Sequence, residues 1–255
     1  MAGAMLQGWL AAGLDPARFA VSDPGKSQLP AGVRGLAALP KDEWFDVILL
    51  GVKPQLLNEV APQVEHLAGP GTVVISILAG VELEVLGNHF PRAGGLLRLM
   101  PNLAAALGKS PMAMASSGLD QPSRDGAMDF LAPLGTPEWI DEAEFDLVTA
   151  LAGSGPAFVY RFIDALAAAA ADLGLSPDKA ERLAVAMAEG ASALASSSPY
   201  GPGELAKRVA SPGGTTQAGL DALDEAEVLQ KLIVRTLRAA RDRSAEMAQE
   251  ARRRG

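Results

Sequence analysis

The chain has 255 residues, 49% of them hydrophobic and 20% charged, which is the composition of a soluble globular protein with room for one large domain or two ordinary ones. Its net charge of −8 argues against nucleic acid or an anionic membrane as a partner. There is no cysteine, which excludes disulfides and thiolate zinc sites. With only two histidines, His66 and His89, we expect neither a metal site nor a Ser-His-Asp hydrolase.

The first 14 residues form an apolar segment that lacks the positive charge of a signal peptide and is too short to span a bilayer. We predict a buried helix over residues 2–12. No later stretch holds about eighteen uncharged apolar residues, so we expect no membrane span and a cytoplasmic protein. The arginine-rich end, residues 235–254, is interpreted as a solvated helix face or a subunit contact.

The first half of the chain alternates strand-like and helix-like segments. Strands are predicted over residues 18–22, 46–50, 72–78 and 96–100, helices over residues 53–66 and 81–89, and a strand–helix–strand segment over residues 112–140. This alternation predicts an α/β fold with a parallel sheet, in which ligands bind beyond the carboxyl ends of the strands.

From residue 144 onward the sequence predicts only helices, separated by loops rich in glycine, proline and serine. We therefore divide the chain into an α/β domain at residues 1–143 and an all-α domain at residues 144–255. The helix that carries Phe158 and Phe162 is apolar on nearly all sides, so we expect it to be buried. In so small a domain, a buried helix of this kind suggests a subunit interface.

The strongest local motif is SPGGTT, residues 211–216, which follows a helix over residues 204–210. Pro212 ends that helix, the glycines permit a tight turn, and Thr215 or Thr216 begins the next helix. Free backbone N–H groups and the positive end of a helix dipole then converge on a site suited to a carboxylate. In the alternative interpretation one threonine is only an N-cap, but two glycines beside three hydroxyl residues exceed what such a turn requires.

Three further motifs lie where predicted strands end: GVKP at residues 51–54, SILAGV at residues 76–81 and RLMPN at residues 98–102. These ends are the expected place for a nucleotide cofactor. Lys53 could contact a phosphate or a ribose, and Asn102 offers an amide to a planar ring.

Together with AGSGPAF and VASPGGTTQAGLDAL, these motifs resemble the pyrroline-5-carboxylate reductases in order and spacing, over essentially the whole chain. The resemblance implies reduction of 1-pyrroline-5-carboxylate to L-proline, the last step of proline biosynthesis, by NADPH or NADH. It also implies an N-terminal Rossmann-like domain and a helical substrate-binding and dimerisation domain. Assembly would be a homodimer or a ring of dimers formed through the C-terminal helices.

The resemblance also implies roles for individual residues. The hydroxyl of Thr216, the catalytic residue, would hydrogen-bond the ring nitrogen. The substrate carboxylate would be held by Ser211, Gly213, Gly214, Thr215 and Thr216. Hydride attack on a C=N carbon needs a hydrogen-bond donor at nitrogen and a fixed angle, and no strong base. The cofactor would be bound by Ala2, Met5, Ser22, Asp23, Val52, Lys53, Pro54, Leu78, Ala79, Gly80 and Asn102.

The chain departs from this family at its start, where the family has a buried strand and a Gly-x-Gly-Asn-Met turn. Met1 corresponds to that methionine, so the first strand and the pyrophosphate-binding glycines are expected to be missing. One hypothesis is a reading frame started about ten residues late. The alternative is a truncated, non-catalytic homologue that acts as a helical oligomer or binding partner.

Two further choices stay open. Asp23 closes the second family strand and favours the free ribose of NADH, whereas Ser22, Lys26 and Ser27 could bind the 2′-phosphate of NADPH, the usual cofactor of the family. A related imine or β-hydroxyacid dehydrogenase is also compatible with the fold, but the latter class needs a catalytic lysine. The helical half contains Lys179 and Lys207, and neither lies in the Gly-Ser-Gly-Pro loop or the SPGGTT motif.

Overall fold

The computed structural model describes residues 1–25 and 28–254 and divides the chain into two compact units. The first unit comprises Met1–Ser154 together with the chain from Ala239 onward, and the second comprises Gly155–Arg238. The first unit thus extends past residue 143 and includes the end of the last helix, because that helix packs on the sheet domain. Among the described residues, no helix is long and apolar enough to cross a membrane.

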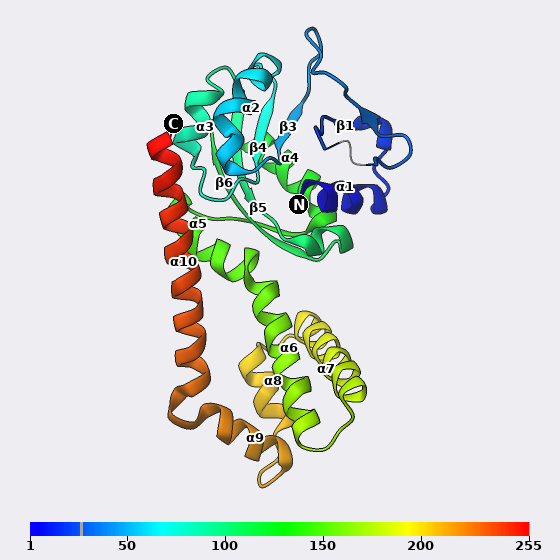
Figure 1. Cartoon of the computed structure of the whole chain (residues 1–255), viewed down its shortest axis with the longest axis vertical. Coiled ribbons are helices and arrows are strands. Elements are labelled where there is room, and N and C mark those ends of the chain that lie inside the picture. The colour runs from blue at the N-terminus through cyan, green and yellow to red at the C-terminus, as the bar shows by residue number, and fades with distance from the viewer. Residues whose placement is uncertain (26–27, 255) are drawn as a thin grey trace. The chain divides into compact units, whose positions relative to one another are not determined.

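A five-stranded sheet forms the centre of the first unit (Figure 1). Its order is β3 (Val47–Leu50), β4 (Val73–Ser76), β5 (Gly95–Met100), β6 (Ser110–Ser117) and β7 (Gly135–Trp139). β3, β4 and β5 are parallel, as the alternating pattern predicts. β6 runs antiparallel to β5 because only a short 3₁₀ segment joins them, and a parallel partner needs a longer crossover. β7 is parallel to β6.

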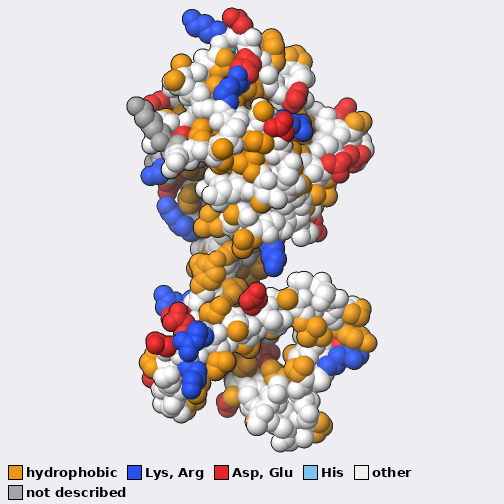
Figure 2. All heavy atoms as spheres, turned by 90° about the vertical axis from the view of Figure 1, so that its right-hand side faces the viewer, with side chains coloured by type: hydrophobic (Ala, Val, Ile, Leu, Met, Phe, Trp, Pro, Cys, Tyr) orange, Lys and Arg blue, Asp and Glu red, His pale blue; other side chains and the backbone are white. Residues whose placement is uncertain are grey.

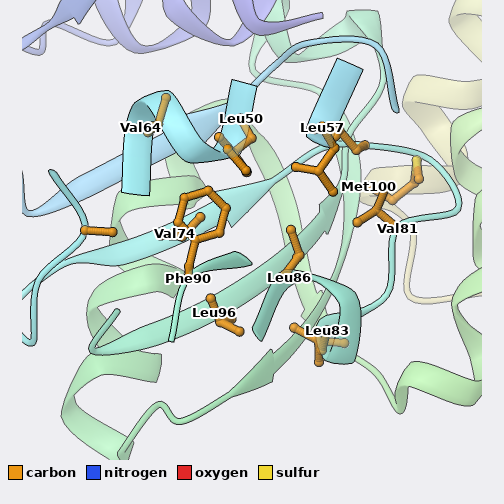
Figure 3. Close-up of a cluster of buried hydrophobic side chains, with 14 of the residues drawn as sticks. Leu50, Leu57, Val64, Val74, Val81, Leu83, Leu86, Phe90, Leu96 and Met100 are labelled. Carbon is orange, nitrogen blue, oxygen red and sulfur yellow. The ribbon is translucent and has the colours of Figure 1, made fainter. Parts of the chain in front are cut away.

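Helices cover both faces of this sheet. On one face, α2 (Leu57–Val64) and α3 (Leu83–His89) pack on β3, β4 and β5, and Figure 3 shows their apolar side chains meeting around Val74 and Phe90. On the other face lie α1 (Ala2–Ala11) and α4 (Gln121–Leu131). Successive strand residues alternate between the two clusters: Val74 belongs to the first and Ile75 to the second. This alternation explains why the strands read as continuous apolar runs.

The predicted N-terminal helix is confirmed as a buried element. Met5 and Trp9 of α1 are 0% and 3% exposed, and they pack with Ile75 and Leu97 of the sheet. The indole N–H of Trp9 donates to the carbonyl of Phe130, so the one polar atom of this side chain is satisfied.

Two short strands stand apart from the main sheet. β1 (Ala20–Val21) pairs in parallel with β2 (Arg34–Gly35), and neither pairs with β3. Within the described chain, β3 is therefore an edge strand, and only Leu50 of it is fully buried. The start of α1 lies at the end of this strand, because a Cβ on Gly51 would come within 2.8 Å of the Cβ of Ala2.

The second unit is entirely helical among its described residues, as predicted. It contains α6 (Gly155–Asp172), α7 (Pro177–Ser197), α8 (Pro202–Val209), α9 (Thr215–Asp224) and the beginning of α10 (Val228–Arg254). The predicted burial of α6 does not occur within a single chain: the helix has no fully buried residue. Figure 2 shows hydrophobic side chains reaching the surface of this unit.

Candidate functional site

The carboxyl ends of three parallel strands meet at one edge of the sheet in the first unit. Leu50 of β3 pairs with Ser76 of β4, and Ser76 pairs with Arg98 of β5. The segments that follow these residues, 51–54, 77–82 and 101–102, therefore gather at the same edge, which is where open α/β sheets bind ligands.

The segment after β3 meets the N-terminus of α1. The carbonyl of Met1 accepts from the amides of Ala4 and Met5, so the earlier amides of α1 are left without an intrahelical acceptor. These amides and the positive end of the helix dipole lie near Gly51, an arrangement that suits a phosphate. Lys53 is exposed, and Pro54 follows it as the first residue of a 3₁₀ turn leading to α2.

The segment after β4 is a tight loop. The hydroxyl of Ser76 accepts from the amide of Leu78 at 3.3 Å, and Gly80 has a φ of +75°, a conformation that favours glycine. Leu78 is 3% exposed and Met5 is 0% exposed, so both side chains are core residues. A cofactor at this edge would meet the backbone of Leu78 and the half-buried Ala79.

Asn102 follows β5 and is only 5% exposed. Its side-chain oxygen accepts from the amide of Ala104 at 2.9 Å, and its Nδ2 donates to the carbonyl of Ala152 at 3.0 Å. That carbonyl belongs to a π-helical segment, Thr149–Gly153. The amide of Asn102 thus ties two segments of the protein together, and its predicted contact with a cofactor ring stays a prediction.

Ser22 and Asp23 follow β1 and are exposed. A carboxylate oxygen of Asp23 accepts from the amide of Gly25 at 2.9 Å, which is the turn that the Ser-Asp-Pro-Gly sequence favours. Lys26 and Ser27, the residues considered for a 2′-phosphate, lie outside the described residues.

In the second unit, the SPGGTT motif forms the predicted turn and helix start. The amide of Gly214 donates to the carbonyl of Ser211 at 2.9 Å, and Gly213 has a φ of +71°. Proline at the second position and a left-handed glycine at the third are typical of a type II turn. The first amide of α9 with a carbonyl acceptor is that of Ala218, which bonds Gly214 at 3.2 Å.

The threonines of this motif begin α9 and are exposed. The N-cap is Gly214, so the alternative in which a threonine caps the helix is wrong. Within the described part of the chain, the hydroxyls of Thr215 and Thr216 make no hydrogen bond. Two free hydroxyls therefore stand beside the unpaired amides of residues 215–217, a set of donors that suits a carboxylate.

Sequence reasoning missed an ion pair between the buried Arg98 and the half-buried Glu142 at the same sheet edge. Arg98 is 3% exposed; its Nη1 donates to an oxygen of Glu142 at 2.8 Å, and its guanidinium lies 3.9 Å from the centre of the Phe145 ring. The same oxygen of Glu142 accepts from the amide of Leu83, at the start of α3, at 2.8 Å. Arg98 is the one charged residue in the otherwise apolar strand β5, and a buried charge needs a partner, so the sequence did offer a signal that a paired acidic residue lies nearby.

A small pocket of about 90 Å³ also lies at this edge. It is lined by the start of α2, by the segment after β4 and by the last helix: Pro54, Gln55, Leu57, Asn58, Ala79, Val81, Val85, Arg243, Met247, Glu250 and Ala251. The pKa of Arg243 is raised because the carboxylate of Glu246 accepts its hydrogen bond and Glu250 adds electrostatic attraction. The described arginines of this helix are exposed, as predicted for a solvated helix face, and the same helix lines the pocket with Met247 and Ala251.

Known proteins resemble this chain over nearly its whole length. Residues 142–247 match the family model described as pyrroline-5-carboxylate reductase dimerisation. Pyrroline-5-carboxylate reductase of Pseudomonas aeruginosa is 34% identical over 98% of this chain and 94% of its own. The solved structure of that enzyme from Coxiella burnetii matches with a TM-score of 0.88 and 27% identity, over 97% of this chain and 95% of that one.

A structure of pyrroline carboxylate reductase from Plasmodium falciparum, which has NADP bound, matches with a TM-score of 0.82. It is 24% identical and covers 96% of this chain and 93% of its own, so it supports the fold alone.

Proposed function

The chain belongs to the pyrroline-5-carboxylate reductase family of oxidoreductases, and we propose that its own residues carry out the reduction of 1-pyrroline-5-carboxylate to L-proline as follows. The observation that carries this proposal is the free donor set of the SPGGTT turn at the start of α9. A nicotinamide cofactor, when bound, supplies the hydride.

The substrate is a small ring with one carboxylate and one C=N bond. We assign the carboxylate to the turn of residues 211–214 and the first amides of α9, where N–H groups and the helix dipole favour a negative charge. Two features make Thr216 suitable for the ring nitrogen: it is exposed, and its hydroxyl has no partner in the described chain.

Reduction adds one hydride to the ring carbon and one proton to the imine nitrogen, and because Thr216 is exposed, water beside its hydroxyl can supply that proton. A hydroxyl can donate a hydrogen bond to this nitrogen and fix the angle of the ring. No side chain with a strongly shifted pKa is needed for this role. The two histidines take no part in the proposal.

The edge formed by β3, β4 and β5 has residues that fit a dinucleotide. The N-terminus of α1 beside Gly51 can hold the diphosphate, and Ser22 and Asp23 can contact a ribose. We propose NADPH as the cofactor, with NADH as a second donor, because the family usually prefers NADPH. Asp23 favours the free ribose of NADH, so it would reduce the difference in affinity between NADPH and NADH.

We further propose that the protein works in the cytoplasm as a homodimer or a ring of dimers formed through the helical unit. The dimerisation family model supports this assembly, as does the exposure of Val159, Tyr160 and Phe162 on α6 by 51%, 67% and 48%. Large hydrophobic side chains at these exposures are typical of an interface.

The direct test is oxidation of NADPH and NADH by the purified protein in the presence of 1-pyrroline-5-carboxylate, followed by the fall in nicotinamide absorbance. We expect turnover with both cofactors and no turnover with a β-hydroxyacid and NADP. A folded protein that oxidises neither cofactor would contradict the proposal and favour the non-catalytic homologue.

A further inference from the structure

The end of α10 belongs to the same unit as the sheet and packs on the loop that follows β4. We call residues 77–82 the β4 loop and residues 239–253 the C-terminal segment. Figure 1 shows the red end of α10 beside α3, which begins immediately after this loop. Two kinds of contact, one of backbone and one of charge, join the segment to the loop.

The backbone contact is at Gly80. A Cβ on this residue would lie 3.0 Å from the amide nitrogen of Ala248 and 3.0 Å from the carbonyl carbon of Met247. Both atoms are helix backbone and cannot move aside as a flexible side chain would. Ala248 itself is only 2% exposed, so a small residue is needed on the helix as well as in the loop.

Two polar contacts hold the C-terminal segment in place, one on the β4 loop and one on a neighbouring helix. Nη2 of Arg252 donates to an oxygen of Glu82 at 2.7 Å, across 170 residues of sequence. The hydroxyl of Ser244, 6% exposed, donates to a carboxylate oxygen of Asp146 at 2.7 Å and thereby holds the helix on α5 (Phe145–Val148). The segment is therefore anchored to the unit at one point and to the loop at another.

The loop and the segment also form two walls of the same 90 Å³ pocket, with Ala79 on one side and Met247 on the other. The cofactor is proposed to lie against the backbone of Leu78 and the half-buried Ala79 of this loop. We propose that Arg252 and Ala248 are positioning residues that hold the β4 loop in the shape that binds the nicotinamide cofactor; this inference rests on the proposed function. Neither residue takes part in the chemical step.

The first test uses Arg252→Met, with Arg241→Met as its matched control. Arg241 lies on the same helix, is exposed, and pairs with the adjacent Asp242, so its loss removes the same charge without touching the loop. Hydrogen exchange of the amides of residues 78–83 measures the loop directly. We expect exchange to rise about 2- to 5-fold in Arg252→Met, the range for a partly exposed ion pair, and to stay unchanged in the control. Unchanged exchange in Arg252→Met would overturn the inference.

The second test measures NADPH affinity by fluorescence and by steady-state kinetics. We expect the dissociation constant and the KM for NADPH to rise by about the same factor, while kcat and the KM for 1-pyrroline-5-carboxylate stay within about twofold. Ala248→Leu, which enlarges a 2% exposed side chain on the part of the helix that lies against Gly80, should have the larger effect. Faster exchange with unchanged NADPH affinity would overturn the link to the cofactor. If the wild-type protein binds NADPH without reducing the substrate, the proposed function fails, and the binding comparison still decides the inference.

Discussion

Among single residues, Thr215 and Thr216 matter most for the proposed reaction. Their hydroxyls lie at the start of α9 and have no hydrogen-bond partner within the described chain. A threonine in the first turn of a helix usually has the option of bonding nearby backbone. In this chain Gly214 takes the N-cap position, so the hydroxyl of Thr216 is left available beside amides that are also unpaired. Such a set of donors is costly to the protein unless water or a ligand satisfies it.

We predict that Thr216→Ala lowers kcat with 1-pyrroline-5-carboxylate by about 100- to 1,000-fold, the range expected for loss of one hydrogen-bond donor at a reacting group. NADPH affinity should change little, because the hydroxyl acts at the substrate nitrogen. Stopped-flow or steady-state oxidation of NADPH measures the first quantity, and fluorescence titration the second.

Thr236→Ala is the control, since the Thr236 hydroxyl lies in the same unit and donates to the carbonyl of Leu232 within α10. This variant should keep wild-type kcat. Equal rates for Thr216→Ala and the wild-type protein would remove Thr216 from the mechanism.

Sequence predicts a feature of single residues when neighbouring residues determine it, and fails when distant residues do. The turn at Pro212 and Gly213 was predictable because those two residues restrict their own backbone angles. The pairing of Arg98 with Glu142 was not, because the partners are 44 residues apart and only the packing of α3 and α5 against β5 brings them together. For the same reason, the contact between Arg252 and Glu82 had no sequence signal.

Among the elements, the central parallel strands could be predicted from sequence. The direction of β6 and the separation of β1 and β2 from the main sheet could not. β3 and β4 lie within the predicted segments and β5 begins one residue before its own, because a run of apolar residues buried on both faces is a strong signal. The reversal of β6 depends on the length of one connection. The separation of β1 and β2 from the sheet depends on what pairs with β3, which the apolar pattern does not specify.

The free edge of β3 predicts a gain of stability on adding a strand. Because α1 begins at the end of β3, a strand leading into Ala2 would run parallel to β3. We predict that fusing a short strand and a glycine-rich turn before Met1 raises the melting temperature and tightens NADPH binding. Differential scanning calorimetry and fluorescence titration measure these effects.

A fusion of the same composition in scrambled order is the control for this experiment. An edge strand with unpaired N–H and C=O groups accepts a partner only if the pairing register places apolar side chains on the covered faces. The same melting temperature for both fusions would contradict the expected pairing with β3.

At the scale of the whole molecule, the helical unit carries its hydrophobic side chains on the outside. The sequence correctly marked α6 as apolar all round, and the single chain leaves this helix without a fully buried residue. The match of residues 142–247 to a dimerisation family supports our proposal that a second copy of the chain covers this helix. In that proposal, the burial of α6 could not follow from one chain because the covering surface belongs to another.

We predict that Phe162→Glu weakens self-association by at least about tenfold, because a charge would be buried in the proposed interface. Sedimentation velocity over a range of concentrations measures the dissociation constant. Leu107→Glu, at a 76% exposed position of the other unit, should leave association unchanged. A wild-type protein that stays monomeric at all concentrations would contradict the proposed assembly.

The proposed function requires that the C=N carbon of 1-pyrroline-5-carboxylate receive one hydride from a nicotinamide cofactor while the hydroxyls and amides at the start of α9 hold the substrate. Mass spectrometry of the product formed with NADPH deuterated at the transferring position tests it most directly. We expect L-proline carrying a single deuterium at the ring carbon that was doubly bonded to nitrogen, and slower formation of this product in Thr216→Ala. Absence of proline, or proline without deuterium, would contradict it.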